Sequence, residues 1–170
     1  MMKRALPYIL LFALLLGADM ISKWWVQDFL VQMPYASRAF PYGGIALFKD
    51  FFGIEGSLVY VSNRGAAWGS FANSYLTLLV LRIAVSTALV VYLFFCKRAA
   101  KTTLPLVLIL FGAVGNIVDC FIYGHVIDMI HLKFWGYSYP VFNLADSAIC
   151  IGAVWLAFQS WRSRERIEVA

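Results

Sequence analysis

The chain has 170 residues, of which 62% are apolar and only 14% are charged. A soluble domain carries about 45–50% apolar and 25% charged residues, and a domain of this length could not bury so much apolar surface. Together with a mean hydropathy of +0.78, this composition excludes a soluble protein, a disordered chain and a disulfide scaffold. The three cysteines lack paired spacing, so we expect packing residues and disfavour a thiol oxidoreductase.

Four segments are long and apolar enough to cross the roughly 30 Å of a bilayer's hydrocarbon core. They cover about residues 5–27, 74–96, 104–123 and 141–161. The first span opens at a proline and lacks a small-x-small cleavage site, so we interpret it as a retained anchor. The sequence thus predicts a single integral membrane domain over residues 1–170.

The basic residues set the expected orientation, although the net charge of +5 could by itself suggest nucleic acid. Eight of the 14 lie in three short clusters beside the spans: Lys3, Arg4, Lys97, Arg98, Lys101, Arg162, Arg164 and Arg166. The positive-inside rule places these clusters, and hence both termini, in the cytoplasm. We therefore expect a lipid bilayer, and no nucleic acid, as the partner of this surface.

The connection over residues 28–73 then faces outwards and is too long for a plain turn. Its alternating stretch Ser57–Ser62 is typical of a strand. We predict an all-α membrane protein with four transmembrane helices and a small extracytoplasmic β-element in this segment.

Ionisable groups at membrane depth are costly and usually mark a function or a buried pair. In the expected orientation the polar candidates gather near the outer leaflet: Asp19, Lys23, Asn116, Asp119, Asp128, Asn143 and Asp146. Asp19 precedes Lys23 by four residues, which predicts a structural ion pair on one helix face. Asn116 and Asp119 also share a helix face. Their spacing fits hydrogen bonds to neighbouring helices and contacts with a substrate equally well. Arg82 receives no role.

Asp128 and Asp146 each lie where a span meets an outer connection. Two carboxyl groups that face each other in a low dielectric share a proton, so one can activate water while the other binds a carbonyl oxygen. This pattern indicates aspartic-protease chemistry. Two alternatives remain open here: a metal site at His125, Asp128 and His131, and a transporter or proton relay that uses intramembrane acids.

Four short blocks resemble the lipoprotein signal peptidases (signal peptidase II), in the family's order and over nearly the whole chain. They are Asp19-x-x-x-Lys23, Asn63–Gly69, Gly115–Asp119 followed by Val126–Asp128, and Phe142–Ser147.

The resemblance implies an aspartic endopeptidase of the bacterial inner membrane that acts near the outer leaflet. It implies cleavage of prolipoproteins immediately before the diacylglyceryl-modified cysteine, with no cofactor and no metal, and we expect a monomer. Asp128 and Asp146 match the catalytic pair. Residues that match substrate-binding or supporting positions are Asn63, Asn116, Asp119 and Asn143, and we add Gly65, whose lack of a side chain permits close approach of a substrate.

The chain departs from the family at Cys120, where an arginine usually follows the aspartate. That arginine helps to hold substrate and neighbouring backbone. Either Arg64 or Arg82 could supply the missing charge. We also expect segment 28–73 to cover the active site.

Overall fold

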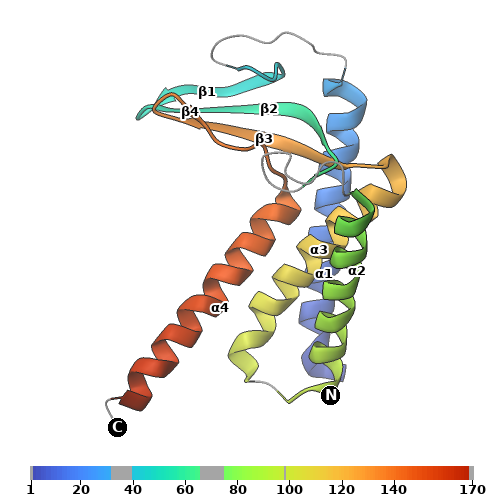
Figure 1. Ribbon diagram of the computed structural model, residues 1–170, viewed down its shortest axis with the longest axis vertical. Coiled ribbons are helices and arrows are strands. Elements are labelled where there is room, and N and C mark those ends of the chain that lie inside the picture. The colour runs from blue at the N-terminus through green and yellow to red at the C-terminus, as the bar shows by residue number, and fades with distance from the viewer. Residues whose placement is uncertain (1, 32–39, 66–74, 98, 169–170) are drawn as a thin grey trace.

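The structure is a computed structural model that describes residues 2–31, 40–65, 75–97 and 99–168. Its helices are α1 (Met2–Trp25), α2 (Tyr75–Phe95), α3 (Thr103–Tyr123) and α4 (Leu144–Glu168). A four-stranded sheet lies across one end of the helices, whereas α1 begins and α4 ends at the opposite end (Figure 1). The predicted class, a helical membrane protein with a small β-element, is confirmed.

Each helix contains a stretch that is long and apolar enough to cross a membrane: Ala5–Leu30, Tyr75–Phe95, Ala100–Tyr123 and Leu144–Ser163. A π-helical turn, η1 (Val26–Leu30), extends the first stretch beyond α1, and the 3-10 turn η4 (Ala100–Thr102) precedes α3. Pro7 lies inside α1 and not at its start, because the helix already begins at Met2.

Helix α3 is the centre of the bundle, since 56% of its apolar window is buried, against 6% in α1, 6% in α2 and 17% in α4. Small residues let its neighbours approach closely. A Cβ on Gly112 would lie 2.2 Å from the Ala145 carbonyl oxygen, and a Cβ on Gly115 would lie 2.9 Å from Asp19 Oδ2. Glycine at these two positions therefore brings α1 and α4 against α3.

The sheet is antiparallel, with the order β1 (Ile45–Phe51), β2 (Ile54–Asn63), β3 (Val126–Phe134) and β4 (Tyr137–Ser138). The strand predicted at Ser57–Ser62 lies within β2. The second connection contributes β3 and β4, which the sequence analysis did not anticipate. Its signal was a β-branched, aromatic-containing run between Gly124 and Gly136, and only its pairing with β2 makes that run a strand.

Strand β3 joins the sheet to the helices. Gly124 ends α3 in the left-handed region, with φ 73°, and its N–H donates to the Cys120 carbonyl at 3.2 Å. On the other side of the strand, Phe142 O accepts from Met129 N at 3.0 Å and from Ile130 N at 2.8 Å. The chain before α4 is thereby held against β3.

Candidate active site

A cavity of about 250 Å³ lies where the sheet meets the helices, and both predicted aspartates line it. Its walls come from β2 and the residues just after it, from α2, α3 and β3, and from the start of α4 with the chain that precedes it. The lining residues are Asn63, Gly65, Arg82, Asn116, Val126, Asp128, Tyr139, Pro140, Val141, Phe142 and Asp146. Segments that are far apart in sequence thus converge on the two carboxyl groups.

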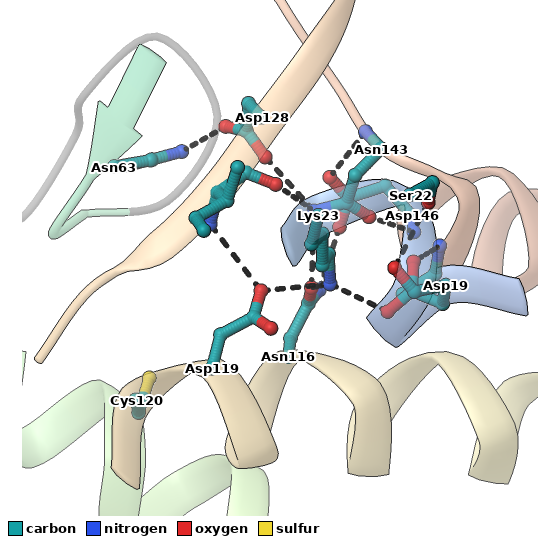
Figure 2. A network of polar contacts seen from close by, with 12 residues as sticks. Asp19, Ser22, Lys23, Asn63, Asn116, Asp119, Cys120, Asp128, Asn143 and Asp146 are labelled. Carbon is teal, nitrogen blue, oxygen red and sulfur yellow. Dashed lines mark hydrogen bonds and ion pairs between the residues drawn. The ribbon is translucent and has the colours of Figure 1, made fainter. Parts of the chain in front are cut away.

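Asp128 lies on the inner strand β3, opposite Val61 of β2, and its side chain is buried. Asn63 Nδ2 donates to Asp128 Oδ2 at 2.9 Å, and Asn143 Nδ2 donates to Oδ1 at 2.9 Å (Figure 2). Each oxygen therefore has an amide donor from a different element. The sequence placed Asp128 just beyond the third span, and in the structure this position lies on a strand that follows α3.

Asp146 lies in the first turn of α4, which begins three residues later than the predicted span because Asn143 caps it. The Asp146 N–H donates to Asn143 Oδ1 at 2.8 Å, and the Asn143 N–H donates to Asp146 Oδ2 at 3.4 Å. This reciprocal arrangement is a capping box with asparagine and aspartate. Asn116 Nδ2 adds a third contact, to Asp146 Oδ1 at 2.7 Å.

Asn143 connects the two aspartates and is completely buried. Its Nδ2 group contacts Asp128 Oδ1, Asn116 Oδ1 at 3.1 Å and the Ile127 carbonyl at 3.2 Å. Its backbone N–H and Oδ1 belong to the cap that holds Asp146. One asparagine therefore fixes both carboxyl groups relative to each other.

Beneath this pair, Lys23 is buried between two acids. Its Nζ lies 2.6 Å from Asp19 Oδ2 and 2.7 Å from Asp119 Oδ2, and it donates to Asn116 Oδ1 at 3.3 Å. The predicted Asp19–Lys23 pair is present. Asp119 is the second partner of the lysine, and no local pattern in the sequence predicts it, because nothing local relates α1 to α3.

The two acids also bind backbone groups next to the candidate pair. Asp19 Oδ1 accepts from the Ala145 N–H at 3.1 Å, and Asp119 Oδ2 accepts from the Ile127 N–H at 3.3 Å. Ala145 precedes Asp146, and Ile127 precedes Asp128. The Lys23 cluster (Asp19, Lys23 and Asp119) therefore positions the backbone of the two segments that carry the candidate catalytic acids, the start of β3 and the start of α4. Neither acid of the cluster lines the cavity.

The surroundings of Asp128 favour its neutral form. Burial, and then the charge of Asp146, raise the pKa of Asp128 to about 7 from an ordinary value of 3.8. The hydrogen bonds from Asn63 and Asn143 act in the opposite direction and stabilise the carboxylate, but they are outweighed. A carboxyl group that still holds a proton near neutral pH can donate a hydrogen bond to a substrate.

His125 and His131, the alternative metal ligands, have separate partners. His125 Nε2 lies 3.0 Å from the Tyr60 hydroxyl, while His131 contacts Ser138 Oγ at 2.8 Å and Ser57 Oγ at 3.4 Å. Asp128 and His131 are three residues apart on one strand, so their side chains leave opposite faces. Within the described part of the chain, no three side chains of the His, Cys, Asp or Glu type are grouped as metal ligands.

The structure places further residues at the cavity. Arg82 lines its wall, as do the residues over 139–142, which had been interpreted as loop and helix start. Gly65 is buried there, and its N–H donates to Asn63 Oδ1 at 2.8 Å. The remainder of the Asn63–Gly69 block, from Ala66 onwards, lies outside the described residues.

A family model described as signal peptidase (SPase) II matches residues 11–162. A lipoprotein signal peptidase of Chlamydia trachomatis serovar L2 is 33% identical over 165 residues, or 95% of each chain. One of Clostridium acetobutylicum is 34% identical over 88% of this chain and 90% of its own length. One of Burkholderia multivorans is 42% identical over 74% and 75%, respectively.

The fold is also that of two solved bacterial membrane enzymes. The first has a TM-score of 0.75 at 22% identity, with 94% of this chain and 90% of that chain covered. The second has a TM-score of 0.69 at 23% identity, with 90% and 91% covered. At these identities the similarity shows a shared fold, that is, a shared arrangement of helices and sheet.

Proposed function

Because the chain belongs to the signal peptidase II family, we propose that it removes the signal peptide from prolipoproteins with Asp128 and Asp146 as its catalytic pair. The bond that is cut immediately precedes the diacylglyceryl-modified cysteine. One observation carries this proposal above all others. Both carboxyl groups line the same cavity and both accept a hydrogen bond from Asn143, Asp128 from its side-chain amide and Asp146 from its backbone N–H.

The two aspartates have different roles because their environments differ. Asp146 lies at the N-terminus of α4, where the Asn143 N–H donates to its carboxyl group and the helix dipole favours a negative charge. Asp128 retains a proton, since burial and the neighbouring carboxylate raise its pKa to about 7. Asp146 is therefore the base and Asp128 the hydrogen-bond donor.

In the reaction, water gives a proton to Asp146 while its oxygen bonds to the carbonyl carbon of the scissile peptide. Asp128 transfers its proton to the carbonyl oxygen, and a tetrahedral intermediate forms. When the intermediate collapses, Asp146 passes the proton to the leaving nitrogen, the C–N bond breaks, and Asp128 regains its proton. The pair needs no metal and no cofactor, because two carboxyl groups complete every proton transfer.

The remaining polar residues support this pair. Asn63 and Asn143 hold Asp128, whereas Asn116 holds Asp146. The Lys23 cluster fixes the backbone beside each acid, and all these groups come from one chain, which supports action as a monomer. A transporter or proton relay is not favoured, because the acids gather at the sheet end of the bundle and not along its length.

We place the protein in the bacterial inner membrane with both termini in the cytoplasm and the sheet outside. The start of α1 and the end of α4, which carry two of the basic clusters, lie at the end of the helices away from the sheet (Figure 1). Labelling with a membrane-impermeant maleimide tests this orientation. Cys96, which is exposed beyond α2, should react only in opened cells, and a cysteine introduced at Lys49 on β1 should react in intact spheroplasts.

The activity itself is tested with purified full-length protein in detergent and a diacylglyceryl-modified prolipoprotein. Mass spectrometry should detect the shortened lipoprotein and the free signal peptide, with the new N-terminus at the modified cysteine. The same prolipoprotein without its lipid serves as the control and should remain uncut. A cut at another bond, or no cut in the lipidated substrate, would contradict the proposal.

A further inference from the structure

Arg82 is the one charged residue of α2, a helix whose apolar window has a mean hydropathy of 2.3. A guanidinium at this depth is costly and usually has a partner or a task. The ion pairs found within the described residues are those of Lys23 with Asp19 and Asp119 and of Lys133 with Glu55, and none includes Arg82. Among the described residues, no carboxylate therefore forms an ion pair with the Arg82 guanidinium.

The side chain of Arg82 reaches the wall of the cavity that Asp128 and Asp146 also line. Its Nη2 donates to the Gly65 carbonyl at 3.2 Å, and its Nη1 contacts Cys120 Sγ at 3.5 Å. The guanidinium thus connects the chain after β2 with α3 at the edge of the candidate site.

A guanidinium carries five N–H donors in a planar fork, and these two contacts use only part of them. The contact with Cys120 is also weak, because sulfur is a poor acceptor. Among the described residues that line the cavity, Arg82 is the only cation, and the amides of Asn63 and Asn116 are already engaged with the aspartates. Arg82 therefore has N–H donors at the cavity wall that can bind an incoming acceptor.

We propose that Arg82 is a substrate-binding residue that donates hydrogen bonds to a backbone carbonyl oxygen of the signal peptide while it holds Gly65 in place. Carbonyl oxygens are the acceptors that an extended peptide presents next to its scissile bond. The inference rests on the proposed peptidase function, and it selects Arg82, which lines the cavity, over Arg64 as the residue that binds the substrate.

The neighbouring Cys120 makes this arrangement possible. The Cys120 side chain is small and buried, and its sulfur lies 3.5 Å from Arg82 Nη1. Figure 2 shows Cys120 on α3, next to Asp119 of the polar network. Tyr75 OH donates to the Cys120 carbonyl at 3.1 Å and ties the start of α2 to the same residue. A long side chain at position 120 would occupy the space that Arg82 fills from α2.

The test compares the wild type with Arg82→Gln, Arg82→Lys and Thr87→Ala in the full-length protein. Thr87 is a matched control, because it is exposed on the same helix and its hydroxyl bonds only to the Ile83 carbonyl at 2.8 Å. Loss of a hydrogen bond to a charged group should lower kcat/KM roughly 10- to 100-fold in Arg82→Gln, mainly through KM. Arg82→Lys keeps the charge without the fork and should lie in between, and Thr87→Ala should match the wild type.

Two substrates distinguish a hydrogen bond from Arg82 to a peptide carbonyl from a hydrogen bond to a lipid ester carbonyl. One prolipoprotein carries the usual diacyl ester, and the other carries a dialkyl ether, which has no ester carbonyl. The Arg82→Gln defect should be the same with both substrates. A defect that vanishes with the ether substrate would overturn the assignment to the peptide.

The melting temperatures of all variants are measured on the same preparations. Unchanged KM values in folded Arg82→Gln and Arg82→Lys would overturn the inference while the peptidase function stands. A wild-type protein that cleaves neither substrate would instead refute the proposed function.

Discussion

Asn143 and Asp146 bind each other across the first turn of α4, with Asp146 N donating to Asn143 Oδ1 at 2.8 Å and Asn143 N donating to Asp146 Oδ2 at 3.4 Å. This capping box fixes the carboxyl group on a rigid helix end. The amide of the same asparagine also reaches Asp128 Oδ1 at 2.9 Å. The helix cap and the candidate catalytic pair are therefore one structure.

We expect Asp128→Asn and Asp146→Asn each to lower kcat by about 10³-fold or more, because an amide cannot exchange the proton that the reaction moves. Size and most hydrogen bonds are preserved, so both proteins should still fold and insert. Rates of prolipoprotein cleavage and melting temperatures check this. Asp28→Asn is the matched control, as Asp28 is exposed in η1, and near-normal turnover in either pair variant would disprove the assignment.

The pH dependence follows from the proton on Asp128. Its pKa is about 7, so kcat/KM should fall as the pH rises above 7 and the pair loses its shared proton. Asn63 lowers this pKa through its hydrogen bond, and Asn63→Ala should therefore move the descending limb to higher pH. Profiles from pH 5 to 9 test the direction, with Ser62→Ala, an exposed change on β2, as the control. A shift to lower pH would contradict the electrostatic account.

Metal removal should leave the activity unchanged, because the carboxyl pair moves every proton by itself. EDTA is the first test. His131→Ala is the second, and we expect a loss of thermal stability, since His131 is buried between Ser57 and Ser138, but a normal kcat/KM in the folded fraction. Activity that disappears with EDTA and returns with zinc would instead favour the site at His125, Asp128 and His131.

Gly65→Val should raise KM about tenfold or more, because it adds a branched side chain at the cavity wall where Gly65 is buried between Asn63 and Arg82. This variant also tests whether the segment over 28–73 contributes to substrate binding. Kinetics and melting temperature are measured on one preparation. If the variant only melts earlier and cleaves normally, Gly65 makes a turn and does not contact the substrate.

Lys23→Met should destabilise the protein by about 3–5 kcal/mol, because it leaves Asp19 and Asp119 buried without their cation. Lys133→Met is the matched control. Lys133 pairs with Glu55 at 3.1 Å in a partly exposed position, and such pairs contribute about 1 kcal/mol or less. Thermal unfolding in detergent measures both, and equal losses would show that the Lys23 cluster is not the buried frame of the site.

The sequence alone was enough to predict the four helices and the residues of the polar site. Membrane spans are visible locally because each needs a long apolar run, and an acid such as Asp146 is conspicuous in such a run. The Asp19–Lys23 pair was also predictable, since both residues lie on one helix face. The resemblance of four short blocks then assigned the candidate catalytic aspartates.

The tertiary structure decided what those residues contact. β3 is a strand because it pairs with β2, a relationship over some 70 residues that no local pattern contains. The same applies to Lys23, which meets Asp119 of α3, and to Arg82, which reaches the site from α2 beside Cys120. Composition and spacing show which residues are costly to place in a membrane. A contact between two elements depends instead on how they pack, as where Gly112 and Gly115 let α4 and α1 approach α3 closely.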